Sequence, residues 1–197
     1  IASIQKNSSF THQIIVHVND GSDGTLEWLK TQDFSYSVSA ENVGVCYAMN
    51  AMATLAMTDY LLYINDDMYV CPLWDKVLYA QIQQAGHKLF YYSATMIEPT
   101  FSRNPCAIAP HDFGHSPVDF KESDLLQFAK SVRKNDWYGA SWPPSVVHRE
   151  VWDQVGGFSV EFSPGFGSDP DFSMKLWNIG VRDFRGLGKS LVYHFQS

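Results

Sequence analysis

A continuous apolar stretch at residues 60–64 (YLLYI) ends directly in the polar triplet Asn65-Asp66-Asp67. A strand with apolar side chains on both faces is typical of parallel sheets that helices cover on both sides. Ligands bind at the carboxyl ends of the strands in such sheets. The stretch therefore predicts a buried strand that presents two adjacent carboxylates at the ligand-binding edge of an α/β sheet.

The rest of the chain alternates short apolar runs with helical stretches, which predicts an α/β domain built on a mostly parallel sheet. We expect further strands at residues 14–18, 35–39, 89–96 and 145–148. We expect helices at residues 25–30, 44–57, 72–85, 121–134, 149–155 and 169–179. Residues 98–117 are rich in Pro, His, Asn and Gly and predict a long functional loop. With 197 residues, 45% of them hydrophobic, the sequence predicts a single domain over residues 1–197.

Charge, hydropathy and cysteine content argue against several kinds of partner and site. The net charge is −7, and Lys and Arg are scattered singly, which argues against nucleic acid as a partner. No apolar run approaches the roughly 18 residues that span a bilayer, so we expect no membrane span. Three widely spaced cysteines indicate neither a disulfide framework nor a zinc site. A cytoplasmic protein, in solution or at the cytoplasmic face of a membrane, fits this composition best.

Three pairs of carboxylates follow expected strands or begin expected helices. The pairs are Asp20 with Asp23, Asp66 with Asp67, and Asp169 with Asp171. Carboxylates can hold a diphosphate only through a divalent cation that binds both, and hard oxygen ligands favour Mn²⁺ or Mg²⁺. A solvated turn explains the Asp66-Asp67 pair equally well on spacing alone.

The segments around these pairs resemble the inverting glycosyltransferases of family 2. The similar segments are IIVHVNDGSDGTLEWL, ENVGVCYAMNAMATLAMTDYLLYINDDMYVCP and VGGFSVEFSPGFGSDPDFSMKLWNIG, and the resemblance runs from about Ile14 to His194. It implies the GT-A fold, a Rossmann-like α/β/α sandwich around a central, mostly parallel sheet. It also implies transfer of a sugar from a nucleotide diphosphate donor, most commonly a UDP-sugar, to a hydroxyl of a carbohydrate or glycoconjugate acceptor.

The resemblance assigns the donor side of the site to the first two pairs. Asp20 would accept a hydrogen bond from the donor base, and Asp66 would hold the ribose. Asn65 stands at the first position of the family's DxD motif and would also contact the donor. Asp67 would bind the metal that bridges the two phosphates, and His194 falls where related enzymes place a histidine that closes the site or binds the metal.

The acceptor side follows from the last segment. Asp169 would be the general base that takes the proton from the acceptor hydroxyl, so that one displacement inverts the anomeric carbon. Asp171 is a candidate acceptor contact, although its place in the first turn of a helix is explained by the helix dipole alone. Trp142 could stack on an acceptor sugar, and core packing is an equally good interpretation.

The sequence departs from the family's pattern in three places. Asn65 replaces the first Asp of the DxD form, and Ser168 stands where a Glu normally precedes the base. Only thirteen residues precede Ile14, so we expect the family's first strand to be absent or supplied from elsewhere. This last departure motivates an alternative, a non-catalytic domain that binds carbohydrate or a partner protein. A nucleotidyltransferase is a further alternative, but such proteins usually have a Gly-rich, basic phosphate loop.

Overall fold

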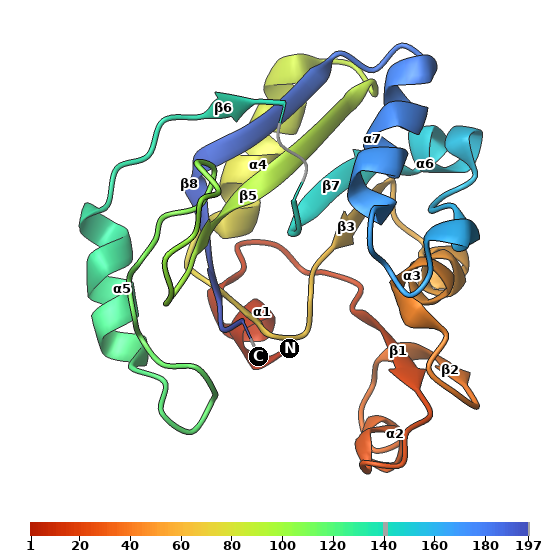
Figure 1. The fold of residues 1–197 in the computed structure, drawn as a ribbon, viewed down its shortest axis with the longest axis horizontal. Helices are drawn as coiled ribbons and strands as arrows, with labels where there is room; N and C mark the ends of the chain where they lie inside the picture. The colour runs from red at the N-terminus through yellow and green to blue at the C-terminus, as the bar shows by residue number, and fades with distance from the viewer. Residues whose placement is uncertain (140–141, 197) are drawn as a thin grey trace. The chain divides into compact units, whose positions relative to one another are not determined.

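The computed structural model describes residues 1–139 and 142–196 (Figure 1). Its helices are α1 (Ala2–Asn7), α2 (Thr25–Leu29), α3 (Gly44–Leu55), α4 (Trp74–Ala85), α5 (Glu122–Ser131), α6 (Arg149–Val155), the 3-10 helix η1 (Val160–Phe162) and α7 (Ser168–Asn178). Its strands are β1 (Ile15–Asn19), β2 (Ser35–Ser39), β3 (Tyr60–Tyr63), β4 (Met68–Val70), β5 (Phe90–Ile97), β6 (Trp137–Tyr138), β7 (Ser145–His148) and β8 (Asp183–His194). The predicted α/β class is confirmed, around a central and mostly parallel sheet.

The chain divides into two compact units, each made of segments distant in sequence. The first unit comprises Ile1–Thr11, Leu62–Val146 and Asp183–Ser197, and the second comprises His12–Leu61 and Val147–Arg182. The boundaries cross strands β3 and β7, which belong to the larger sheet, of strand order β3-β7-β5-β8-β4 with β6 also paired to β8. The prediction of one domain over residues 1–197 stays a prediction.

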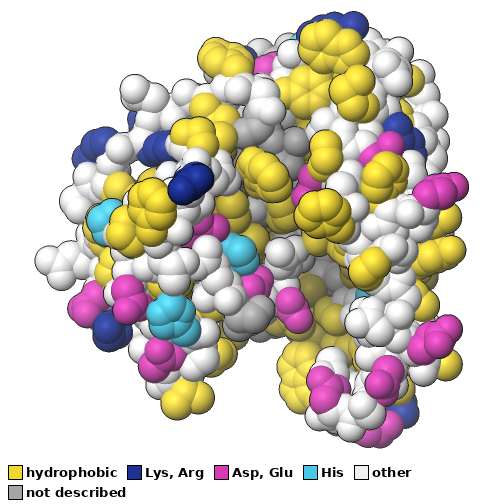
Figure 2. Space-filling view, viewed as in Figure 1, with side chains coloured by type: hydrophobic (Ala, Val, Ile, Leu, Met, Phe, Trp, Pro, Cys, Tyr) yellow, Lys and Arg dark blue, Asp and Glu magenta, His cyan; other side chains and the backbone are white. Residues whose placement is uncertain are grey.

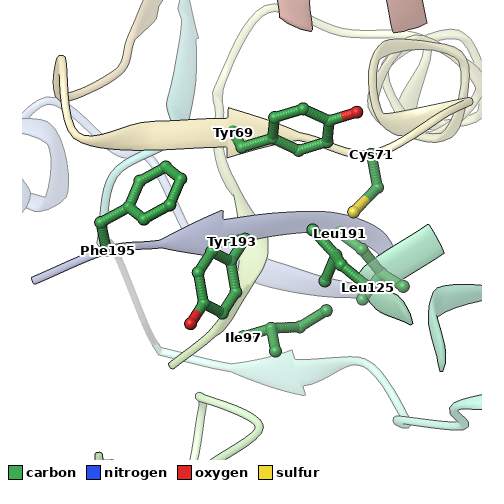
Figure 3. Close-up of a cluster of buried hydrophobic side chains, with 7 residues drawn as sticks. All are labelled: Tyr69, Cys71, Ile97, Leu125, Leu191, Tyr193 and Phe195. Atoms are coloured by element: carbon green, nitrogen blue, oxygen red, sulfur yellow. The ribbon is translucent and has the colours of Figure 1, made fainter. Parts of the chain in front are cut away.

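Strand β8 organises the first unit. It pairs in parallel with β5 and antiparallel with β4 and β6. Leu191 and Tyr193 belong to a buried cluster with Leu125 of α5, as Figure 3 shows. Ser190, which alternates with them along the strand, instead donates its hydroxyl to the carbonyl oxygen of Trp74 in α4. Because successive side chains point to opposite faces of a sheet, α4 and α5 cover opposite faces of β8.

The second unit contains a parallel pair of strands, β1 and β2, on which α3 packs. Helix α3 is tied to the turn before η1 by Asn50, which donates to the Phe158 carbonyl and accepts from the Phe158 amide. The rings of Trp152, Phe158 and Phe172 pack against one another in edge-on and tilted arrangements and join α6 to α7. This core fixes the position of α7, on which the predicted general base lies.

Two expectations about the strands are wrong. Strand β3 does not have both faces fully buried, because each of its four residues is only partly buried. It stands at one end of the strand order in the described sheet, where only one neighbouring strand covers its edge. Strands β1 and β2 do not extend the sheet that contains β3; they form a two-stranded sheet of their own.

Helix length also bears on the predicted absence of a membrane span. Within residues 1–139 and 142–196, no helix is both long enough and apolar enough to cross a bilayer.

Candidate functional site

The ends of three neighbouring strands in the first unit bring two predicted site residues together. Met68 pairs with His194 in the antiparallel β4–β8 ladder, and the amide of Phe195 donates to the carbonyl of Asp67 at 3.0 Å. Asp67, just before β4, is therefore held beside His194, the last residue of β8. The imidazole Nε2 of His194 lies 3.2 Å from Oδ2 of Asp67. The two residues that the family resemblance assigned to the metal are thus in direct contact.

A third charged residue, Glu98, completes this cluster. It follows β5, whose last residue Ile97 pairs with Tyr193 of β8. Its Oε1 lies 3.1 Å from Nδ1 of His194. Hydrogen bonding to Asp67 raises the pKa of His194, and Glu98 raises it further, while burial lowers it. The imidazole thus lies between two carboxylates on one edge of the sheet.

The donor atoms of this cluster can be compared with what a divalent cation requires. Residues 1–139 and 142–196 contain no group of three or more His, Cys, Asp or Glu side chains arranged to hold a metal. Mg²⁺ and similar ions are often held by only one or two protein carboxylates, with substrate phosphates and waters completing the shell. Asp67 and His194 together offer one carboxylate oxygen and one imidazole nitrogen, with side chains only 14% and 20% exposed. Such a pair fits a cation that a diphosphate helps to bind, and its nitrogen donor suits Mn²⁺ better than Mg²⁺.

Asn65 and Asp66 precede this pair in the turn between β3 and β4. Asp66 is exposed and Asn65 is partly buried. An exposed carboxylate next to a partly buried one can contact a ligand from solvent while its neighbour stays at the sheet edge. The arrangement is compatible with the predicted donor contacts of both residues, which remain predictions.

Asp20 lies in the second unit, in the turn that follows β1. It has a left-handed backbone conformation with φ of 63°, which is uncommon for a residue other than glycine. Its Oδ1 accepts from the Ser22 amide at 2.9 Å, and its own amide donates to the Ser39 carbonyl of β2. The turn therefore fixes an exposed carboxylate at the end of β1.

Asp169 is the second residue of α7, also in the second unit. Burial raises the pKa of its carboxyl group from 3.8 to about 6. Its Oδ1 is buried and has no hydrogen-bond partner in the described part of the chain. A carboxylate that is destabilised by burial and lacks a donor is a stronger base than an exposed one. Asp169 is therefore suited to accept a proton near neutral pH.

The surroundings of Asp169 contain a second carboxylate and a thiol. Asp171 lies in the same first turn of α7, and its Oδ2 is buried without a hydrogen-bond partner among the described residues. Burial raises the pKa of the Cys46 thiol in α3, a hydrogen bond to Ser168 lowers it, and the charges of Asp169 and Asp171 raise it. Cys46 is fully buried, so it is a packing residue and not a nucleophile.

The remaining predicted contact, Trp142, belongs to the first unit. The residue is 44% exposed, which disfavours the interpretation as core filler. Residues 140–141, which precede it in the Trp-rich segment, lie outside the described residues.

The candidate residues therefore form two groups. Asn65, Asp66, Asp67, Trp142 and His194 belong to the first unit, in which Asp67 and His194 contact each other. Asp20, Asp169 and Asp171 belong to the second unit. Sequence reasoning missed Glu98, although a signal was present: it is an acidic residue at the end of a largely apolar run, as the Asn65-Asp66-Asp67 triplet is at the end of residues 60–64.

Known structures with the same fold are similar to this chain at low sequence identity. A crystal structure of GalNAc-T7 with UDP, GalNAc and Mn²⁺ superposes with a TM-score of 0.68 at 14% identity. Residues 1–349 of S. aureus TarS superpose with a TM-score of 0.66 at 13% identity, and their complex with UDP gives 0.62 at 13% identity. The chain is covered to 98% in each case but spans only 39% of the GalNAc-T7 chain and 54% of either TarS chain.

The structural neighbours are GT-A glycosyltransferases, so the predicted GT-A fold is confirmed. Among curated proteins, none matches the sequence significantly. The sequence profile of Glycosyl transferase family 2 matches residues 1–151, about three quarters of the chain, and includes Asp20 and the Asn65-Asp66-Asp67 triplet. The chain belongs to glycosyl transferase family 2.

Proposed function

We propose that this chain transfers a sugar from a nucleotide diphosphate donor to an acceptor hydroxyl, with a divalent cation and with inversion of the anomeric carbon. The observation that carries the proposal is the contact between Asp67 and His194, residues far apart in sequence that the family resemblance assigns separately to the metal. UDP is the first nucleotide to test, because two of the similar structures contain it.

On the donor side, the proposal assigns roles to the Asp67 cluster and to Asp20. Asp67 and His194 would hold Mn²⁺ or Mg²⁺, with Mn²⁺ favoured by the imidazole donor and present in the GalNAc-T7 structure. When bound, the cation stabilises the negative charge of the departing diphosphate. Asp66 and Asn65 would bind the ribose side of the donor, and Asp20 the base.

The proposed acceptor chemistry uses Asp169. Its carboxylate would accept the proton of the acceptor hydroxyl as that oxygen forms a bond to the anomeric carbon. The bond between this carbon and the diphosphate oxygen would break on the opposite face, so the electron pair leaves with the nucleoside diphosphate. A pKa of about 6 supports this role, because the base is ionised at neutral pH and still accepts a proton readily. Asp171 and Trp142 are proposed as acceptor contacts.

A transfer assay tests this proposal. The chain is incubated with UDP-, GDP- and TDP-linked sugars, Mn²⁺ and a panel of carbohydrate acceptors, and release of nucleoside diphosphate is measured. The anomeric configuration of any product is read by NMR, and we expect it to be opposite to that of the donor. We expect Asp169→Asn to lose at least about 100-fold in kcat while retaining donor affinity, because a general base contributes roughly 10²–10⁴-fold.

The matched control is Asp153→Asn, the same change at an exposed carboxylate of α6. This variant should transfer at the wild-type rate. Wild-type turnover in Asp169→Asn would remove Asp169 from the mechanism. A product that retains the donor's anomeric configuration would contradict the single displacement.

A second candidate function, a non-catalytic carbohydrate- or partner-binding domain, predicts a different result in the same assay. It predicts binding of sugar or nucleotide without release of nucleoside diphosphate. Asp169 favours the enzyme, because its Oδ1 is buried without a hydrogen-bond partner among the described residues and burial makes the carboxylate a stronger base.

A further inference from the structure

Glu98 is a buried carboxylate to which the proposed function gives no role. Its relative exposure is 5%, and glutamate is almost never so deeply buried unless it is paired. A buried carboxylate that makes no useful contact destabilises a fold. Its neighbours therefore indicate what it does.

The backbone of Glu98 is fixed on both sides. Its amide donates to the Ile108 carbonyl at 3.1 Å, and its carbonyl accepts from the His111 amide at 2.8 Å. The parallel β5–β8 ladder ends in the pair of Ile97 with Tyr193, immediately before Glu98 and His194. Glu98 is thus held beside His194 by main-chain hydrogen bonds that do not depend on its own side chain.

The side chain of Glu98 approaches only one nitrogen of His194. Its Oε1 lies 3.1 Å from Nδ1, whereas Nε2 lies 3.2 Å from Asp67 on the other side. An ionised carboxylate can only accept hydrogen bonds, so Nδ1 must be the donor in this contact. Nε2 donates to Asp67 in the same way while it carries a proton. When Nε2 gives up that proton to bind a cation, the proton on Nδ1 stays in the contact with Glu98, and Nε2 presents its lone pair.

We propose that Glu98 is a positioning residue that fixes the tautomer and ring orientation of His194, so that Nε2 is presented together with Asp67 to a divalent cation. This inference rests on the proposed function. A carboxylate that accepts from the second nitrogen of a metal-binding histidine is a common arrangement, and its loss typically costs about 10–100-fold in metal affinity. Strands β5, β8 and β4 supply Glu98, His194 and Asp67 in that spatial order.

The first measurement needs no metal or nucleotide. Long-range ¹H–¹⁵N NMR spectra of the metal-free Asp67→Ala chain, recorded at a pH where His194 is neutral, report which ring nitrogen carries the proton when Asp67 no longer accepts from Nε2. We expect Asp67→Ala, alone or together with Glu98→Gln, to show the proton on Nδ1, because the Gln side-chain oxygen can still accept. We expect Asp67→Ala with Glu98→Leu to lose this preference. A proton on Nε2 in Asp67→Ala alone would overturn the proposal.

The second measurement is the affinity for Mn²⁺ in the presence of UDP, followed by the EPR signal of free Mn²⁺. We expect Glu98→Leu to bind about 10–100-fold more weakly than the wild type, and Glu98→Gln to recover a large part of that loss. The control is Asp183→Asn, which removes a partly buried carboxylate at the opposite end of β8 and should leave the affinity unchanged.

The outcomes separate this inference from the proposed function. Unchanged Mn²⁺ affinity in Glu98→Leu, beside a wild type that binds, would overturn the positioning role alone. A Gln variant as weak as the Leu variant with its tautomer intact would make Glu98 a direct ligand, which also overturns it. A wild type that binds no Mn²⁺ with any nucleotide would overturn the metal-dependent function itself.

Discussion

At the scale of single residues, burial destabilises the charged form of Asp169 and at the same time makes its carboxylate a stronger base. The helix dipole at the first turn of α7 favours its charged form, yet burial outweighs this effect and raises its pKa to about 6. A carboxyl group whose pKa is higher in the folded than in the unfolded chain destabilises the fold when it is ionised. Asp169 should therefore cost stability at the pH at which it would act.

Asp169→Asn should for this reason stabilise the fold at neutral pH. With pKa values of 3.8 unfolded and about 6 folded, the cost is on the order of 2–3 kcal/mol above pH 6 and fades as the pH falls towards 4. Chemical unfolding of both proteins at pH 7.5 and at pH 4 measures this difference. A variant that is equally stable or less stable than the wild type at pH 7.5 would contradict the assignment of a raised pKa.

The rate of transfer should depend on the same ionisation. A general base acts only when it is deprotonated, so kcat/KM should fall as the pH drops through about 6, with a tenfold loss per pH unit below it. The pH profile of wild-type kcat/KM between pH 5 and 8 tests this. A profile that is flat down to pH 5 would show that a group of lower pKa, or no base, controls the step.

Residue patterns in the sequence point to some of these candidate groups and not to others. The DxD-like triplet and the acidic start of α7 are local, so the sequence could point to Asp67 and Asp169. Glu98 acts through His194, and this relation depends on the pairing of β5 with β8, which no local pattern contains. The burial that raises the pKa of Asp169 is likewise a property of packing and not of its neighbours in sequence.

At the scale of elements, β8 is the feature that sequence periodicity missed. Strands β2 and β7 and helix α6 match their predicted bounds, because each has a clear pattern of apolar residues or residues that mark where the element ends. Residues 183–194 contain Gly186, Gly188 and Lys189, which interrupt any apolar alternation, although they form the longest strand in the described chain. Glycine in a strand often marks a place where another group approaches closely.

Gly186 shows why glycine is required in β8. A Cβ atom built there would lie 1.9 Å from Cε2 of Trp137, whose strand β6 pairs with β8 at this position. Gly186→Ala should therefore displace the indole and destabilise the fold by about 1–3 kcal/mol, measured by chemical unfolding. Gly186→Ala should lower the free energy of unfolding much less when Trp137 is also replaced by Ala. An equal loss of unfolding free energy in the two backgrounds would contradict this explanation.

At the scale of the whole molecule, family membership and fold could be predicted because the motifs occur in the family's order along the chain. The separation of β1 and β2 from the sheet that contains β3 could not be predicted, since it depends on which strands lie beside one another. The face drawn in Figure 2 has Lys and Arg side chains in isolated positions and no broad basic patch. The exclusion of nucleic acid as a partner stays a prediction from the net charge of −7.

The most direct test of the account is calorimetric titration of the chain with UDP, GDP and TDP, each with Mn²⁺ and again with EDTA. We predict that one nucleotide, UDP first among them, binds with Mn²⁺ and at least about tenfold more weakly with EDTA. Asp67→Ala should abolish this dependence on metal, while Asp124→Ala, at an exposed carboxylate of α5, should preserve it. Binding of no nucleotide, or equal binding with Mn²⁺ and EDTA, would contradict a metal-dependent sugar transfer by this chain.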